Sequence, residues 1–223
     1  MGLVKKLMNN YIDNGYKTID DLPANSLMNM SDKDKIEKTK ILIIDDDELE
    51  LEKTLRRIGY NVTWKQDIDV LNDVEDYPII ICDYKGVGRN FKSEFEGLNL
   101  SKLIKEKYPE KILYLLSAAS FNPKANSCIK YLDEFVLKGE EDKIIEYIKE
   151  DSDKLFDSKE KWIRYKEILK SKGIKEKDIF RLEDLYVRSC IENKDILSSN
   201  ALFKKINMNL NINFDIKVGL INL

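Results

Sequence analysis

Hydrophobic residues in this 223-residue chain form short uninterrupted runs, and each run ends at a polar or charged residue. Four runs stand out, at 41–44, 79–82, 112–116 and 135–137, and each contains isoleucine or valine. Short apolar runs of this composition are typical of parallel strands that are buried on both faces. Residues 62–64 form a fifth, shorter candidate strand.

Amphipathic segments separate these runs. They predict helices over 47–58, 67–75, 97–107, 123–131 and 140–150. Five alternations of strand and helix predict an α/β fold with a doubly wound, five-stranded parallel sheet.

The flanking regions have helical patterns of a different kind. Apolar residues at helical spacing occupy the first 14 positions, and a polar stretch at 29–35 has the composition of a linker. Beyond residue 150 three helical faces follow, and the end of the chain, 207–223, is compatible with a strand or with disorder. We therefore expect three parts: an N-terminal helical segment with its linker, 1–38; the α/β domain, 39–150; and a helical region for dimerisation or protein binding, 151–223.

Polar residues that can bind or accept a phosphoryl group follow the four apolar runs. They are Asp45, Asp46 and Asp47; Asp83; Ser117; and Lys138. Ligands of parallel α/β sheets bind beyond the carboxyl ends of the strands, so these side chains are expected to converge. Carboxylates, a hydroxyl and an ammonium at one edge suit Mg²⁺-dependent phosphoryl transfer.

With the strands placed, residues 40–150 resemble a response-regulator receiver domain, the phosphorylatable module of two-component signalling. The matching segments are 40–48, 77–83, 115–118 and 135–138. The resemblance implies a flavodoxin-like sheet with strand order 2-1-3-4-5. It also implies phosphorylation by a sensor histidine kinase or a histidine phosphotransfer protein.

The resemblance also assigns roles to individual residues. Asp83 is the phosphoacceptor and a ligand of Mg²⁺, Asp46 binds the metal directly, and Asp45 acts mainly through water. The backbone carbonyl of Lys85 is the third protein ligand. Lys138 neutralises the phosphoryl oxygens. Two further residues form the switch: Ser117, which donates its hydroxyl, and the aromatic Phe135.

Three features depart from the family pattern. A glycine, Gly139, follows Lys138 where the family usually has a proline after a cis bond. The loop after Asp83 carries an insert at about 86–96, which contains Arg89; we favour an ordinary solvated loop over a lid on the site. The first helix is about one turn short. These features indicate an atypical receiver without removing a chemical group.

Simpler interpretations and other functions remain open. Asp45–Asp47 alone could be a solvated strand end or a helix N-cap. The domain could also be a pseudo-receiver, which acts as a binding or oligomerisation module without phosphorylation. The spacing of Asp45 and Asp47 also fits a haloacid-dehalogenase-type phosphohydrolase, although the later strand ends fit a receiver better. We expect no enzymatic activity beyond phosphorylation and dephosphorylation of the chain itself.

Composition limits the kinds of site, the cellular compartment and the partners to be expected. The chain has no histidine, so it carries no histidine-based triad or metal site and no phosphohistidine of its own. Three scattered cysteines, no signal peptide and no apolar run of membrane-spanning length favour a cytoplasmic protein. Net charge is −3, and residues 151–223 carry only 15 basic against 12 acidic side chains. This balance and the lack of a helix-turn-helix pattern give no clear indication of nucleic-acid binding. A downstream protein target or self-association is the expected output.

Overall fold

The structure, a computed structural model, describes residues 15–22, 30–92, 95–118 and 129–210. They divide into two compact units. Residues 30–153 form the first, here called the sheet unit. The described parts of 1–29 and 154–223 form the second, called the helical unit.

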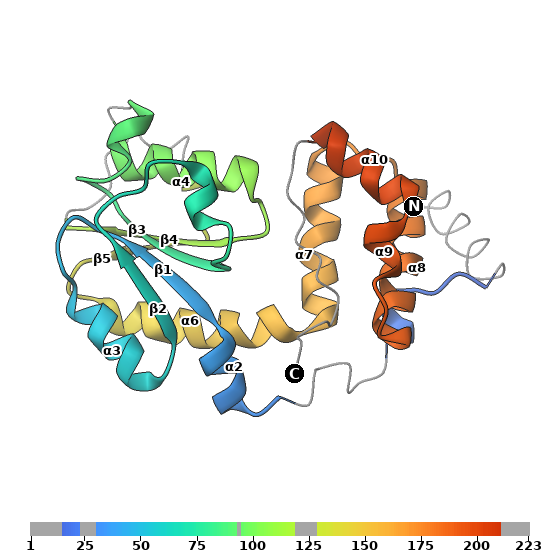
Figure 1. The fold of residues 1–223 in the computed structure, drawn as a ribbon, viewed down its shortest axis with the longest axis horizontal. Helices are drawn as coiled ribbons and strands as arrows, with labels where there is room; N and C mark the ends of the chain where they lie inside the picture. The colour runs from blue at the N-terminus through green and yellow to red at the C-terminus, as the bar shows by residue number, and fades with distance from the viewer. Residues whose placement is uncertain (1–14, 23–29, 93–94, 119–128, 211–223) are drawn as a thin grey trace. The chain divides into compact units, whose positions relative to one another are not determined.

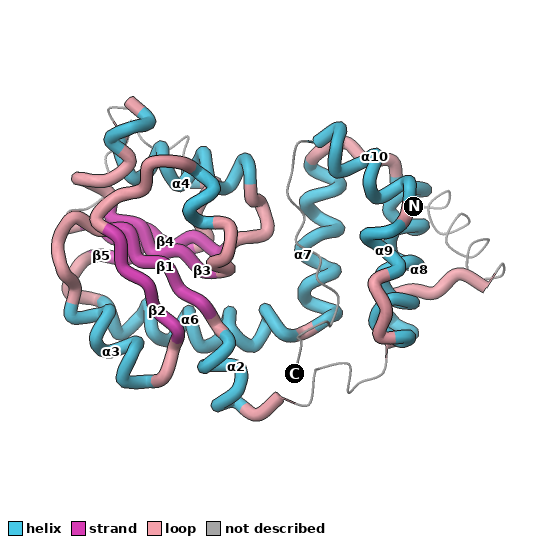
Figure 2. Tube along the Cα trace, viewed as in Figure 1, coloured by secondary structure: helices cyan, strands magenta, loops and turns pink. Residues whose placement is uncertain are grey.

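A five-stranded sheet, with every pair of neighbouring strands parallel, is the centre of the sheet unit (Figure 2). The strands are β1 Lys40–Ile44, β2 Asn61–Lys65, β3 Ile79–Asp83, β4 Ile112–Ser117 and β5 Glu134–Leu137. Their order is β2-β1-β3-β4-β5, which is the order of flavodoxin-like folds. The expected fold class is confirmed.

Helices cover both faces of this sheet. They are α2 Asp32–Lys38, α3 Glu50–Ile58, α4 Glu96–Lys107 and α6 Glu141–Phe156. Figure 1 shows α4 on one face and α3 and α6 on the other. Every residue of β3 and β4 is buried, because helices exclude water from both sides of a doubly wound sheet.

Two local predictions for the sheet unit are wrong. Residues 67–75 contain only a short 3₁₀ helix, Leu71–Val74, because acidic side chains bind nearby backbone groups and compete with a helix. The carboxylate of Asp73, for example, accepts from the N–H of Asp69 at 3.2 Å. The polar stretch 29–35 is not simply a linker, since α2 begins at Asp32 with Ser31 as its N-cap.

The helical unit contains α7 Ser158–Ser171, α8 Glu176–Glu192, α9 Ile196–Ser199 and α10 Ala201–Leu210. Its core includes Trp162 and Tyr186, whose stacked rings lie 5.1 Å apart. Residues 15–22 belong to the same unit and contribute Leu22 to that core. The expected C-terminal helices are thus confirmed.

The predicted helix in residues 1–14 and most of the one at 123–131 lie outside the described residues. So does the chain beyond 210, although α10 shows that 207–210 are helical. Among the described helices, none combines the length and the apolar character that crossing a membrane requires.

Candidate functional site

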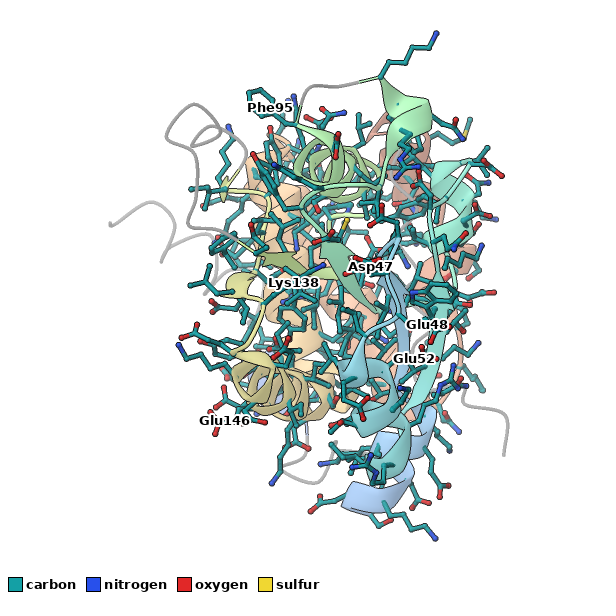
Figure 3. The ribbon with its side chains drawn as sticks, turned by 90° about the vertical axis from the view of Figure 1, so that its left-hand side faces the viewer. Asp47, Glu48, Glu52, Phe95, Lys138 and Glu146 are labelled. Carbon is teal, nitrogen blue, oxygen red and sulfur yellow. The ribbon has the colours of Figure 1, made fainter. Side chains whose placement is uncertain are left out.

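Three of the predicted site residues meet at the carboxyl edge of the sheet. Asp45 follows β1, Asp83 ends β3, and Lys138 follows β5. Lys138 Nζ lies 3.0 Å from Asp45 Oδ2 and 3.2 Å from Asp83 Oδ1. Figure 3 labels Lys138 and Asp47, which follow β5 and β1 at this edge. The sequence spacing alone could not show that one ammonium contacts both carboxylates.

Burial makes this group electrostatically unusual. The two carboxylates are nearly inaccessible: Asp45 is 0% exposed and Asp83 is 7% exposed. Burial and then the neighbouring Asp45 charge raise the pKa of Asp83, although Lys138 opposes this. Burial opposes the charge of Lys138, but its close contacts with the Asp45 and Asp83 carboxylates prevail and raise the pKa of Lys138. Lys138 therefore stays protonated, whereas the negative charge of Asp83 is only partly offset by it.

The two predicted switch residues lie on adjacent strands. Ser117 ends β4 and is buried, and its carbonyl accepts from the backbone N–H of Lys138 at 2.8 Å. Phe135 lies in β5, beside Leu115 of β4 in the sheet register, and packs partly buried against the core. Ser117 is thus at the same edge as Asp83, while the switching roles of both residues stay predictions.

The acidic run after β1 spreads from the interior to the surface. Asp47 donates its backbone N–H to Asp45 Oδ1 at 3.0 Å, and the Trp64 indole N–H donates to the Asp45 carbonyl at 3.0 Å. One carboxylate oxygen from each of Asp45, Asp46 and Asp47 lies within 4.8 Å of the others. This turn presents several oxygen atoms of the kind that hard divalent cations prefer.

The residues present fit a small divalent cation. Asp45 Oδ2 is buried and makes no well-aligned hydrogen bond, although Lys138 Nζ is within ion-pair distance. Gly86 lies directly against the Asp46 carboxylate, since a Cβ at Gly86 would lie 2.2 Å from Asp46 Oδ2. The φ of Gly86, +79°, is also one that residues with a side chain rarely adopt. Lys85, the residue expected to offer its carbonyl, lies in the same loop after β3, and its role stays a prediction.

One contact at the site, between Arg89 and Asp46, was not predicted from the sequence. Arg89, in the insert after β3, places its guanidinium 2.9 Å from Asp46 Oδ2. The sequence identified the insert and its arginine but not which carboxylate the arginine would meet. Arg89 is 67% exposed at its side chain, so it is solvated and in contact with the acidic site at the same time.

Gly139 explains the departure after Lys138. Its φ is +100°, and its N–H donates to Glu141 Oε1 at 2.9 Å. Proline has a fixed negative φ and no N–H, so it can do neither. The described residues contain no cis peptide bond, and the Lys138–Gly139 bond is therefore trans.

Comparison with known proteins found similar solved structures at low sequence identity. No protein-family model and no curated protein matched the sequence. Among solved structures, a response regulator from Thermotoga maritima is 21% identical, with a TM-score of 0.41, over 51% of this chain and 96% of its own. A CheY-like receiver domain protein from Methanospirillum hungatei is 18% identical, with a TM-score of 0.41, over 52% and 94%.

A third similar structure is the receiver domain of an HD-domain-containing protein from Pseudomonas fluorescens. It is 14% identical, with a TM-score of 0.42, over 54% of this chain and 90% of its own. The fold assignment itself rests on the parallel sheet and its strand order. The sheet unit has a flavodoxin-like fold.

Proposed function

We propose that this protein is a phosphorylation-controlled signalling regulator whose Asp83 accepts a phosphoryl group. The observation that carries the proposal is the position of Lys138 Nζ, within 3.2 Å of carboxylate oxygens on both Asp45 and Asp83. An ammonium held within reach of the Asp83 carboxylate can also stabilise the negative charge of a phosphoryl group bound to that carboxylate.

The reaction needs few groups. An oxygen of Asp83 attacks the phosphorus atom and forms an O–P bond. The P–N bond of the donor's phosphohistidine breaks, and its electron pair remains on the imidazole nitrogen. Lys138 stabilises the charge on the phosphoryl oxygens, and the Ser117 hydroxyl donates to one of them.

Asp45, Asp46 and Asp83 would hold Mg²⁺, together with the carbonyl of Lys85. The bound ion would supply positive charge against the phosphoryl oxygens and so assist their transfer. In this arrangement Asp46, whose side chain is 38% exposed, would bind the ion directly, and the buried Asp45 would act mainly through water.

The donor class is a sensor histidine kinase or a histidine phosphotransfer protein. The helical unit is the candidate output, through a downstream protein target or self-association. Size measurement by light scattering, with and without beryllofluoride, tests that output. A change of oligomeric state supports self-association, and an unchanged size favours a separate target.

Incubation with Mg²⁺ and acetyl phosphate tests the central reaction. Intact-mass spectrometry should show the addition of one phosphoryl group to the wild-type chain. Asp83→Asn should abolish the addition because the attacking carboxylate is gone. Asp76→Asn is the matched control: it makes the same substitution at an exposed position of the sheet unit and should react like the wild type.

Equal labelling of the wild type and Asp83→Asn would place the phosphoryl group elsewhere and contradict the proposal. No labelling of any variant, by acetyl phosphate or by a phosphorylated kinase, would favour the second candidate, a phosphorylation-independent binding module. The observation that favours this alternative is the Arg89–Asp46 ion pair, which already neutralises one carboxylate of the acidic site.

A further inference from the structure

The inserted loop after β3 brings a second cation to the acidic edge. Arg89 Nη2 lies 2.9 Å from Asp46 Oδ2, with the two side chains 67% and 38% exposed. Lys138 forms ion pairs with Asp45 and Asp83. The arginine therefore contacts the one carboxylate of the proposed ligand set that Lys138 does not.

The backbone of the loop is held in place without the arginine side chain. Asp67 accepts from the N–H groups of Gly88, at 2.7 Å, and Arg89, at 3.2 Å. Asp69 accepts from the side chain of Asn90 at 2.7 Å. The guanidinium is thus delivered to Asp46 from an anchored backbone, and it can turn into solvent without unfolding the loop.

An ion bound by Asp46 would bring its two charges close to the guanidinium. Like charges a few ångströms apart repel each other, and they do so more strongly where water is partly excluded. Arg89 and a divalent cation therefore cannot share Asp46 Oδ2 in this geometry. One of them has to leave.

We propose that Arg89 is a resident counter-ion that competes with the metal ion for Asp46. This inference rests on the proposed metal-dependent function. The ion pair stabilises the metal-free site, and metal binding first requires the guanidinium to turn away. The insert then sets the metal affinity, and through it the concentration of Mg²⁺ at which Asp83 becomes reactive.

Calorimetric titration of the full chain with Mg²⁺ tests this competition without any measurement of phosphorylation. Arg89→Gln should bind Mg²⁺ about three- to tenfold more tightly than the wild type, since it removes a cation from a partly exposed ligand. Arg89→Lys keeps the charge and should return the affinity toward the wild-type value. Lys92→Gln, the matched control, removes a positive charge three residues along the same loop and should change the affinity less than twofold.

The outcomes separate this inference from the proposed function. Equal or weaker Mg²⁺ binding by Arg89→Gln overturns the competition while leaving the phosphorylation proposal standing. An equal increase of the Mg²⁺ affinity in Lys92→Gln would show a general effect of charge and would also overturn the competition. Tighter Mg²⁺ binding by Arg89→Gln, without a matching increase in Lys92→Gln, supports the competition. Absence of Mg²⁺ binding in all variants removes both this inference and the metal-dependent function.

Discussion

At the scale of single residues, Asp83 is the most informative group. Burial and the nearby Asp45 charge raise its pKa, and Lys138 offsets this only in part. A carboxyl group with a raised folded-state pKa binds more protons in the folded than in the unfolded chain. Its ionisation therefore lowers stability as pH rises from its ordinary pKa, 3.8, through the raised value. The residue best placed to react is thus one whose charge the metal-free fold tolerates poorly.

Asp83→Asn should accordingly make the metal-free protein more stable than the wild type at neutral pH. The difference should shrink as pH falls through the raised pKa of Asp83 and be lost below 3.8, where both the folded and the unfolded forms of Asp83 are protonated. Urea unfolding in EDTA at a series of pH values measures it, with Asp76→Asn as the control. A wild type that gains stability from Asp83 as pH rises would show that Lys138 outweighs burial.

At the scale of elements, the loop between β3 and α4 depends on carboxylates from the loop after β2. Asp67 accepts two backbone N–H groups of the insert, whereas Asp69 accepts only a side-chain amide. Asp67 and Asp69, which lie where a helix was predicted, therefore bind the insert. They anchor the segment that carries Arg89.

Asp67→Ala should release this anchor. Hydrogen exchange at the amides of Gly88 and Arg89 should accelerate about tenfold or more, because hydrogen bonds to a charged acceptor contribute about 1.5–3 kcal/mol. Asp69→Ala, which leaves both backbone bonds in place, should change these two amides little. Unchanged exchange in Asp67→Ala would mean that other contacts hold the loop.

At the scale of the whole molecule, the helical unit is built from both ends of the chain. Asp184 accepts from the backbone N–H of Lys17 at 2.7 Å, and Glu183 accepts from that of Ile19 at 3.0 Å. Both carboxylates are buried on α8 and also bind side-chain cations, Arg188 and Lys166 respectively. The sheet unit is thus an insertion in the sequence of the helical unit, with a separate core.

Leu22→Ala should test whether these cores are energetically separate. Leu22 is 3% exposed in the helical core, and its truncation should cost that unit about 2–5 kcal/mol. Fluorine NMR of 5-fluorotryptophan should show a lower urea midpoint at Trp162, in the helical unit, and an unchanged one at Trp64, in the sheet unit. Lys17→Ala keeps the backbone bond to Asp184 and should alter neither midpoint. Equal shifts at both tryptophans would show that the units unfold together.

The sequence by itself determined where the strands lie and which polar residues follow them. Short uninterrupted apolar runs are typical of the strands of a parallel sheet, and parallel strands bring their carboxyl ends to one edge, so Asp45, Asp83, Ser117 and Lys138 could be placed together from the pattern. Local capping also decided details that periodicity missed, such as the start of α2 at Asp32.

Only the tertiary structure decided which charges meet. Lys138 bridges Asp45 and Asp83, Arg89 takes Asp46, and Asp67 holds the backbone that carries that arginine. The ion pairs join residues from separate strands and loops, whose distances depend on the fold and not on their spacing in the chain. Hydrophobic periodicity encodes burial, while electrostatic pairing follows from where the fold places the charged side chains of separate loops.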